Sequence, residues 1–448
     1  MRRSKQQGGV VADSVVRLAG ALGALLCVSA LGCGSSQSPR AADNPSGGTG
    51  GKPTGGTGGK PAGGTGGGGG SEPVILPPVA CEGLAAKVGV WEDITPPVLR
   101  TPANVETYSV VVSPKDGTLF VTGGNQTNGG ACPAGTDCPV ARSGVQRSSD
   151  CGASFMRVNS DTGDSANLMT GALWAMVMHP TRPEIMYVAN GYGDNPTLYK
   201  STDAGATWSA LSPDPAGDLT FIQAIAIDPD DGNHLALTWH ENCPAPHSLW
   251  CFSRTTDGGQ TWALFEGPTS IPDWDIPGWM EGSAITILGK TSYIVSSPAG
   301  IWFTADTGAT WKQVAPEIVY VGYAGATTIA GGNLFVAGAG HVLFSPAQPD
   351  SDPPYAVTTT GKLEVLPNSP LITALITDGE TVFAGNARND RRPLWTTPVA
   401  NPGGWSQASQ EICRGDVCRG PNNFAYDPVH NVVYAANWGT GLWRYVIK

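Results

Sequence analysis

The sequence predicts an all-β fold, a seven-bladed β-propeller of four-stranded antiparallel blades, from three observations. An eight-residue pattern containing an aspartate and a glycine occurs four times, at a period of about 50 residues. A short strand, a turn and a second strand recur seven times along the chain. The 61 glycines and 37 prolines among 448 residues argue against a mainly helical protein, because both residues interrupt helices.

Composition and charge exclude several classes of protein. The chain has 26 lysines and arginines against 37 aspartates and glutamates, and its net charge is −11. Binding of phosphates needs clustered cations, so no nucleic acid partner is expected. A hydrophobic content of 40% excludes wholesale disorder. No apolar run near twenty residues occurs beyond the N-terminus, which excludes a polytopic membrane protein.

Residues 1–33 are interpreted as an export signal. Basic residues precede an apolar stretch over 18–31 that ends in small residues, and these are the parts of a secretory signal. Residues 30–33, Ala-Leu-Gly-Cys, resemble a bacterial lipobox, although leucine is usual at its first position. The resemblance implies lipidation of Cys33, and Gly34 behind it favours the outer membrane or cell surface of a Gram-negative bacterium. A plain cleaved signal is the alternative.

Residues 34–78 predict a disordered linker rich in glycine, threonine and proline. The run Gly-Gly-Thr-Gly-Gly recurs from positions 47, 55 and 63. No side chain in this run can bury apolar surface, so the segment is expected to be a flexible tether. The propeller is then assigned to residues 79–448. We expect a monomer that reaches the membrane only through its lipid anchor.

The cysteines agree with export. Eight follow the signal, and an even number in an oxidising compartment favours disulfides. A zinc site is the competing interpretation, but no Cys-x-x-Cys or paired histidine spacing supports it. Neither a metal nor another cofactor is therefore expected. Three pairs are close in sequence and the fourth follows by elimination: Cys132–Cys138, Cys243–Cys251, Cys413–Cys418 and Cys81–Cys151.

Each residue of the eight-residue pattern has a physical role, seen in the copy Ser-Thr-Asp-Ala-Gly-Ala-Thr-Trp at 201–208. The carboxylate of Asp203 can accept backbone N–H bonds within a tight turn. Gly205 can adopt a positive φ. Trp208 begins the next strand and is expected to pack beneath the turn. The aspartates of the four copies are Asp150, Asp203, Asp257 and Asp306.

This pattern resembles the Asp-box, or BNR, repeat of sialidases, xyloglucan hydrolases, sortilin-like receptors and many non-enzymatic propellers of the WD40-YVTN-BNR-like superfamily. The resemblance implies a β-propeller but little about activity, because the box closes a hairpin away from the active face. Sialidase activity is not expected. Residues 99–102, Leu-Arg-Thr-Pro, are the only partial match to the first arginine motif of the sialidase family. Residues 123–127 lack the arginine-rich sequence that this family has after the second strand. Xyloglucan hydrolases of this class have two propellers, whereas this chain predicts one.

The two ends of the predicted propeller are expected to close the ring. The last unit, from Phe424 to Lys448, holds about three strands. Residues 88–96 resemble the strand that follows an Asp-box, with Trp91 in the aromatic position. We therefore assign this segment as the fourth strand of the last blade. Closure of this kind removes an exposed sheet edge.

Candidate ligand-binding residues follow from the face on which this family places its sites. Loops that join the second and third strands, and successive blades, share the face opposite the boxes. Tyrosine, tryptophan, asparagine and arginine suit sugar recognition, because rings stack on sugars while amides and guanidinium groups bind hydroxyls or carboxylates. Several positions are also compatible with packing between blades, Trp174 above all. The candidates are Tyr108, Trp174, Asn190, Tyr192, His240, Glu241, Glu281, Tyr323, Arg388 and Trp438.

The leading prediction is an exported, lipid-anchored propeller that recognises a glycan or a surface or extracellular protein without catalysis. The alternative is a carbohydrate-active enzyme that uses the loop face. Glu106 and Glu281 belong to predicted blades one and four, so they can face each other across the axis as the paired carboxylates of a glycoside hydrolase. In a polysaccharide lyase, His240 and a tyrosine can serve as base and acid.

Overall fold

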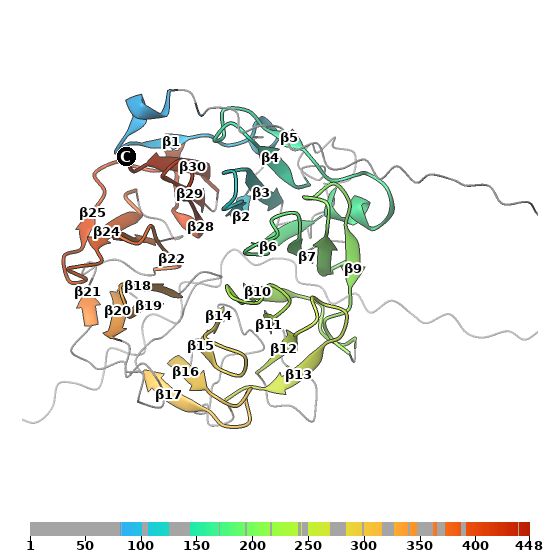
Figure 1. Ribbon diagram of the computed structural model, residues 1–448. Helices are drawn as coiled ribbons and strands as arrows, with labels where there is room; N and C mark the ends of the chain where they lie inside the picture. Colours follow the sequence, from blue (N-terminus) through green and yellow to red (C-terminus); the bar gives the residue numbers. More distant parts are fainter. Residues whose placement is uncertain are drawn as a thin grey trace, which may run out of the picture. The chain divides into compact units, whose positions relative to one another are not determined.

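Seven four-stranded antiparallel sheets form the blades of a β-propeller in the computed structural model (Figure 1). The structure describes residues 81, 83–100, 106–124, 144–169, 171–192, 195–215, 217–240, 243, 250–268, 284–297, 300–315, 327–338, 341–346, 362–364, 372–386, 391–437 and 439–448. They belong to one compact unit, residues 71–448. The predicted signal with Cys33, and the predicted linker, lie outside these residues.

Blades one to four follow the chain, and their strands pair in sequence order. Blade one contains β2 (Glu106–Val112), β3 (Leu119–Gly124), β4 (Gln146–Ser148) and β5 (Met156–Arg157). Blade two contains β6 (Ala172–Met178), β7 (Met186–Tyr192), β8 (Thr197–Ser201) and β9 (Ser209–Leu211). Blade three contains β10 (Ile222–Ile227), β11 (Leu235–Trp239), β12 (Cys251–Thr255) and β13 (Ala263–Glu266). Blade four contains β14 (Ala284–Ile287), β15 (Tyr293–Ser297), β16 (Gly300–Thr304) and β17 (Lys312–Ala315).

Blades five to seven complete the ring. Blade five contains β18 (Thr327–Ala330), β19 (Asn333–Gly338), β20 (His341–Pro346) and β21 (Lys362–Glu364). Blade six contains β22 (Ala374–Thr377), β23 (Thr381–Gly385), β24 (Leu394–Pro398) and β25 (Ser406–Gln407). A two-stranded hairpin, β26 (Cys413–Arg414) and β27 (Val417–Cys418), precedes blade seven. Blade seven contains β28 (Pro421–Asp427), β29 (Val432–Asn437), β30 (Gly441–Val446) and β1 (Trp91–Asp93).

Short 3-10 helices account for the helical content of the described residues. They are η1 (Leu84–Lys87), η2 (Pro97–Leu99) and η4 (Gly163–Met169). Within the part of the chain that the structure describes, no helix has the length and apolar character needed to cross a membrane.

The first strand of each blade lies toward the centre of the ring, where it contacts the first strands of neighbouring blades (Figure 1). In four blades this inner strand carries a β-bulge near its start. A bulge leaves one residue unpaired and redirects its side chain. The blades therefore repeat the same local geometry on one face of the ring. The residues skipped by the pairing are Tyr108, Trp174, Gln223 and Asn422.

Polar side chains join neighbouring blades within an otherwise apolar interface. Ser109 of blade one accepts a hydrogen bond from the backbone N–H of Met176 in blade two, at 3.1 Å. The side-chain oxygen of Asn423 in blade seven accepts one from Val110 in blade one, at 2.9 Å. Ser109, Val110 and Met176 are buried, and each bond gives a backbone N–H of one blade a side-chain partner in the next blade.

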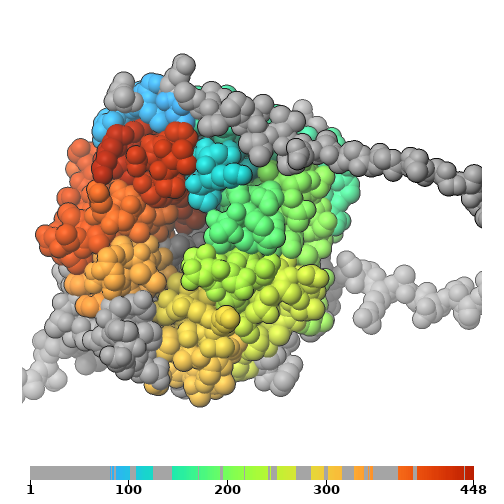
Figure 2. All heavy atoms as spheres, in the orientation of Figure 1, coloured from blue at the N-terminus to red at the C-terminus, as the bar shows by residue number. Residues whose placement is uncertain are grey.

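The ring closes between the two ends of the propeller, as the sequence predicts, and Figure 2 shows the blue N-terminal part against the red C-terminal blade. Strand β1 pairs antiparallel with β30, and Trp91 lies opposite Tyr445. Trp91 is 5% exposed, and its ring centre lies 5.1 Å from that of Tyr445. The sheet order β1-β30-β29-β28 places the N-terminal strand at the outer edge of blade seven. We call the junction of β1 with β30 and with blade one the seam.

Three of the four predicted disulfides are present in the described residues. Cys81–Cys151 joins the segment before β1 to the turn after β4, across the seam. Cys243–Cys251 closes the connection before β12, and Cys413–Cys418 crosses the β26–β27 hairpin. Cys132 and Cys138, the fourth predicted pair, lie outside the described residues.

Candidate functional site

The four predicted aspartate turns, residues 148–155, 201–208, 255–262 and 304–311, share one hydrogen-bond pattern. In the second turn, Oδ1 of Asp203 accepts bonds from the Ser201 hydroxyl at 2.9 Å and from the Thr207 N–H at 2.8 Å. Oδ2 accepts a third bond from the Thr207 hydroxyl at 2.6 Å. Gly205 has a φ of 87°, which a residue with a Cβ rarely adopts. Asp150, Asp257 and Asp306 make the same contacts.

These contacts keep the turn carboxylates charged. Hydrogen bonds from Thr261 hold the pKa of Asp257 at about 2, and those from Thr310 lower the pKa of Asp306. A carboxyl group that is ionised throughout the neutral range cannot donate a proton as a general acid. Both oxygens of each turn aspartate are also already bound. The carboxylates of the four turn aspartates are therefore engaged within their own turns.

Three of the predicted ligand-binding residues come together in a row of rings that we call the aromatic file. Tyr108 of β2 and Trp174 of β6 have ring centres 4.8 Å apart. Phe221, directly before β10, follows at 5.7 Å from Trp174. His240, directly after β11, lies edge-on to Phe221 at 4.6 Å, and its backbone N–H binds the Phe221 carbonyl at 2.9 Å. The file thus crosses blades one, two and three at the bulged ends of their inner strands.

Accessibility decreases along the aromatic file. His240 is partly exposed, whereas Phe221, Trp174 and Tyr108 are 5%, 4% and 1% exposed. The three buried rings pack between blades, and of the four rings only the imidazole is partly exposed. Phe221 was missed by sequence reasoning. Its position directly before the predicted strand that became β10 is the signal that could have identified it.

Asn190 lies in the protein interior rather than on an accessible surface. It is fully buried near the end of β7, and its amide donates a hydrogen bond to the carbonyl of Asn167 at 3.2 Å. Glu106 begins β2 and Tyr192 ends β7, so both stand at the same end of their blades as the aromatic file. The remaining predicted residues lie outside the described residues: Glu241, Glu281, Tyr323, Arg388 and Trp438.

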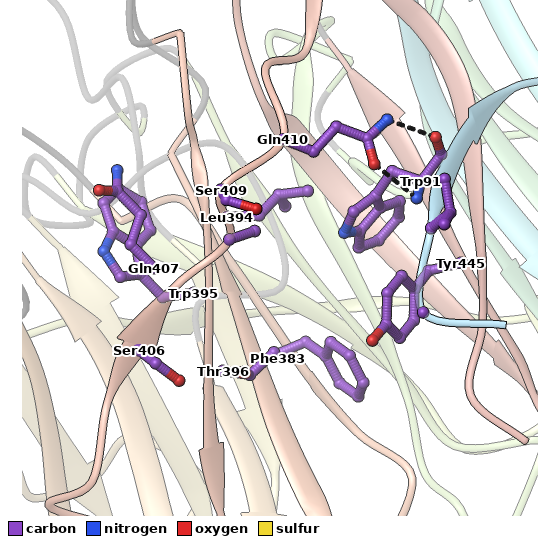
Figure 3. Close-up of a pocket in the computed structure, with 13 residues that line it drawn as sticks. Trp91, Phe383, Leu394, Trp395, Thr396, Ser406, Gln407, Ser409, Gln410 and Tyr445 are labelled. Atoms are coloured by element: carbon purple, nitrogen blue, oxygen red, sulfur yellow. Dashed lines mark hydrogen bonds between the residues drawn. The ribbon is translucent and has the colours of Figure 1, made fainter.

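A cavity of about 330 Å³ lies between blades six and seven, at the outer strands rather than at the axis (Figure 3). We call it the rim groove. Trp91, Tyr445 and Phe383 contribute rings to it, while serine, threonine and glutamine side chains contribute polar groups (Figure 3). Sequence reasoning missed this site, because it forms between strands at opposite ends of the chain. Its lining consists of Gly89, Val90, Trp91, Phe383, Leu394, Trp395, Thr396, Ser406, Gln407, Ala408, Ser409, Gln410 and Tyr445.

One group of potential metal ligands occurs among the described residues: Cys81, Cys151 and His430. The two sulfurs form a disulfide, so neither is a thiolate that can bind a metal. Nδ1 of His430 lies 2.7 Å from a carboxylate oxygen of Asp427. The two cysteines are therefore bonded to each other, and His430 is paired with Asp427.

Comparison with known sequences matches only part of this chain. No family model matches the chain. Over 173 residues it is 25% identical to a xyloglucanase from Hypocrea jecorina (strain QM6a), which is 36% of this chain and 20% of that protein. The chain therefore spans about a fifth of the length of this relative.

Solved structures with similar architecture share little sequence with this chain. A structure of YCF48 bound to a D1 peptide is 15% identical and has a TM-score of 0.50, over 80% of this chain and 97% of that chain. The extracellular domain of BT3049 from B. thetaiotaomicron is 9% identical with a TM-score of 0.49, over 78% of this chain and 42% of that chain. At 15% identity, the likeness to YCF48 concerns the fold alone.

Proposed function

We propose that this protein is an exported, lipid-anchored propeller that recognises a glycan or a surface or extracellular protein without catalysis. The aromatic file carries the proposal. The predicted candidates that the structure brings together are rings, and the four turn aspartates are committed to their own turns. Rings suit stacking and edge contacts with a ligand, whereas glycoside hydrolysis needs two carboxyl groups at a defined separation.

In this proposal His240 is the accessible end of a supported binding surface. Phe221 contacts the imidazole ring, and Trp174 and then Tyr108 continue the row of packed rings behind Phe221. Loop residues that lie outside the described part of the chain, including Glu241, Glu281 and Tyr323, are proposed to complete the surface. A rigid propeller that presents polar loops is suited to recognition, because a scaffold of this kind fixes the positions of the loops.

An array of glycans and extracellular peptides, probed with labelled protein, tests this function. Binding that falls on the order of 10-fold in His240→Ala, with an unchanged melting temperature, is the expected result. Release of reducing sugar should stay at background for every bound glycan. Turnover of a bound glycan would contradict the proposal.

The second candidate, a carbohydrate-active enzyme, is favoured by the partial similarity to a xyloglucanase. Its test is xyloglucan cleavage by the wild-type protein and by Glu106→Gln, Glu281→Gln and His240→Ala. If the protein is an enzyme, loss of an acid or base should reduce turnover by on the order of 10²-fold while binding is retained. Binding that is lost in these variants, with no cleavage by the wild-type protein, would instead indicate recognition alone.

A further inference from the structure

The rim groove is built from two ends of the chain that meet only in the closed ring. Gly89, Val90 and Trp91 form one wall with Tyr445 of β30, and blade six forms the other. Phe383 and Leu394 contribute the apolar part of the second wall. The cavity of about 330 Å³ is at the lower end of the usual size of ligand sites, which is on the order of 300–1,000 Å³.

Gln410 connects the two walls of the rim groove. Its Oε1 accepts a hydrogen bond from the Trp91 N–H at 2.9 Å, and its Nε2 donates to the Trp91 carbonyl (Figure 3). One amide thus satisfies both backbone groups of Trp91 that face away from β30. The connection after β25 is thereby attached to β1 beside the cavity.

Aromatic rings form an angled surface in the groove. Tyr445 is partly exposed, and its ring lies at 36° to Trp91 and at 64° to Phe383, 6.0 Å away. Within the described residues, the Tyr445 hydroxyl has no hydrogen-bond partner, so it is available to a ligand. A partly exposed tyrosine ring with a free hydroxyl offers an apolar face and a polar tip in one side chain.

The remaining polar groups of the groove are uncharged. Ser406 and Ser409 are exposed, and Thr396 is partly exposed between them and Phe383. None of the thirteen lining residues carries a carboxylate, imidazole, guanidinium, ammonium or thiol group. An anionic ligand would need cationic partners, and a wholly apolar ligand would leave these hydroxyls without hydrogen bonds.

We infer that the rim groove binds a neutral saccharide, with a sugar ring against Tyr445 and its hydroxyls bonded to the serine and threonine side chains. The site is separate from the aromatic file, so this inference goes beyond the proposed function. Because β1 supplies part of the wall, the site is complete only when the ring is closed. A saccharide bound here therefore stabilises closure of the propeller by mass action.

Two pairs of variants test the inference. Ser406→Trp fills the groove from an exposed position at the start of β25, directly after Trp405. Ser209→Trp is its matched control, an exposed serine at the start of β9, directly after Trp208. Tyr445→Ala removes the ring, whereas Tyr445→Phe retains the packing with Trp91 and removes only the hydroxyl.

The binding assay uses the secreted full chain with neutral hexose and pentose tetrasaccharides, oligogalacturonates as acidic probes, and valine-rich peptides. We expect a neutral tetrasaccharide to bind and to raise the melting temperature. Ser406→Trp and Tyr445→Ala should weaken binding at least about 10-fold, Tyr445→Phe should weaken it less, and Ser209→Trp should bind as the wild type does.

Three results would overturn the inference: no neutral tetrasaccharide binds, binding is equal in Ser406→Trp and Ser209→Trp, or only acidic sugars or peptides compete for the groove. His240→Ala separates this outcome from the proposed function. A ligand lost in His240→Ala but retained in Ser406→Trp would support recognition at the aromatic file and exclude the groove as its site.

Discussion

Arg444 of β30 binds one carboxylate oxygen of Glu92 in β1 through two hydrogen bonds, from Nε at 3.0 Å and from Nη2 at 2.8 Å. Its Nη1 donates a third bond to the carbonyl of Cys151 at 2.6 Å. One guanidinium group, 10% exposed, therefore joins the closing strand, the last strand and the turn of blade one. The seam is held by charge and hydrogen bonds as well as by strand pairing.

Glu92→Gln should lower the stability of the propeller by about 2 kcal/mol at pH 7, because a largely buried guanidinium loses its ionised partner. Burial raises the pKa of Glu92, but the hydrogen bond and charge of Arg444, with those of Lys87, lower it overall. The ionised carboxylate therefore stabilises the fold above the ordinary pKa of 4.5, and this contribution is lost as the pH falls through the lower folded value.

Thermal melting between pH 7 and pH 3 measures this effect, with Glu380→Gln as the control. Glu380 pairs with Lys448 on the surface, where both side chains are more than half exposed, so its loss should leave the melting temperature unchanged. A Glu92→Gln difference that does not shrink in acid would contradict the role of the carboxylate charge.

Removing the Cys81–Cys151 disulfide should destabilise the protein more than removing Cys413–Cys418. The first closes a loop of 70 residues and the second a loop of 5. Loop-closure entropy then predicts losses of about 4 and about 2 kcal/mol in the two double serine variants. Denaturant unfolding of both variants measures the difference in free energy of unfolding. Equal losses of stability would show that the disulfide at the seam does not act through loop-closure entropy.

Asp257→Asn should lower the melting temperature at neutral pH, with the effect fading between pH 4 and pH 2. Hydrogen bonds from Thr261 lower the pKa of Asp257 to about 2 from 3.8, so the ionised form favours the folded state above that window. Asp161, an exposed residue in a loop, provides the matched control. If Asp161→Asn has the same pH-dependent effect, the turn contacts are not its cause.

Deleting residues 84–97 should abolish cooperative unfolding, because the deletion removes β1 and exposes the edge of β30. Deleting residues 35–75 should leave the melting temperature unchanged, since this segment of the predicted linker is expected to contribute no side chain to the core of the propeller. Calorimetry of both proteins compares them. A cooperative transition after loss of 84–97 would show that the last blade is stable with three strands.

Cys33→Ser should release the protein from membranes if Cys33 is the lipidated residue. The lipobox resemblance and the glycine-rich tether behind it motivate this expectation. Fractionation of cells that express the wild type and the variant provides the measurement, and Cys27→Ser is the matched control. Membrane retention of Cys33→Ser would argue for another anchor.

The sequence alone determined the fold and its closure. The turn that contains Asp203 is held by contacts within a few residues of the aspartate. The turn can therefore be recognised from an eight-residue sequence pattern, and this pattern repeats along the chain at a nearly constant spacing. The position of Trp91 was also predictable, because an incomplete last unit requires a strand from elsewhere. Disulfides between cysteines close in sequence, such as Cys243–Cys251, followed from their number and spacing.

Only the tertiary structure decided which aromatic residues are accessible and where a cavity forms. Tyr108 and Trp174 are residue types that commonly stack on sugar rings, yet packing between blades buries both side chains. The rim groove joins Trp91 to Gln410 across 319 residues, and Arg444 reaches Glu92 across 352. Contacts of this kind depend on how the blades meet around the ring. The local sequence repeats specify each blade separately, so they do not predict which residues of different blades come into contact.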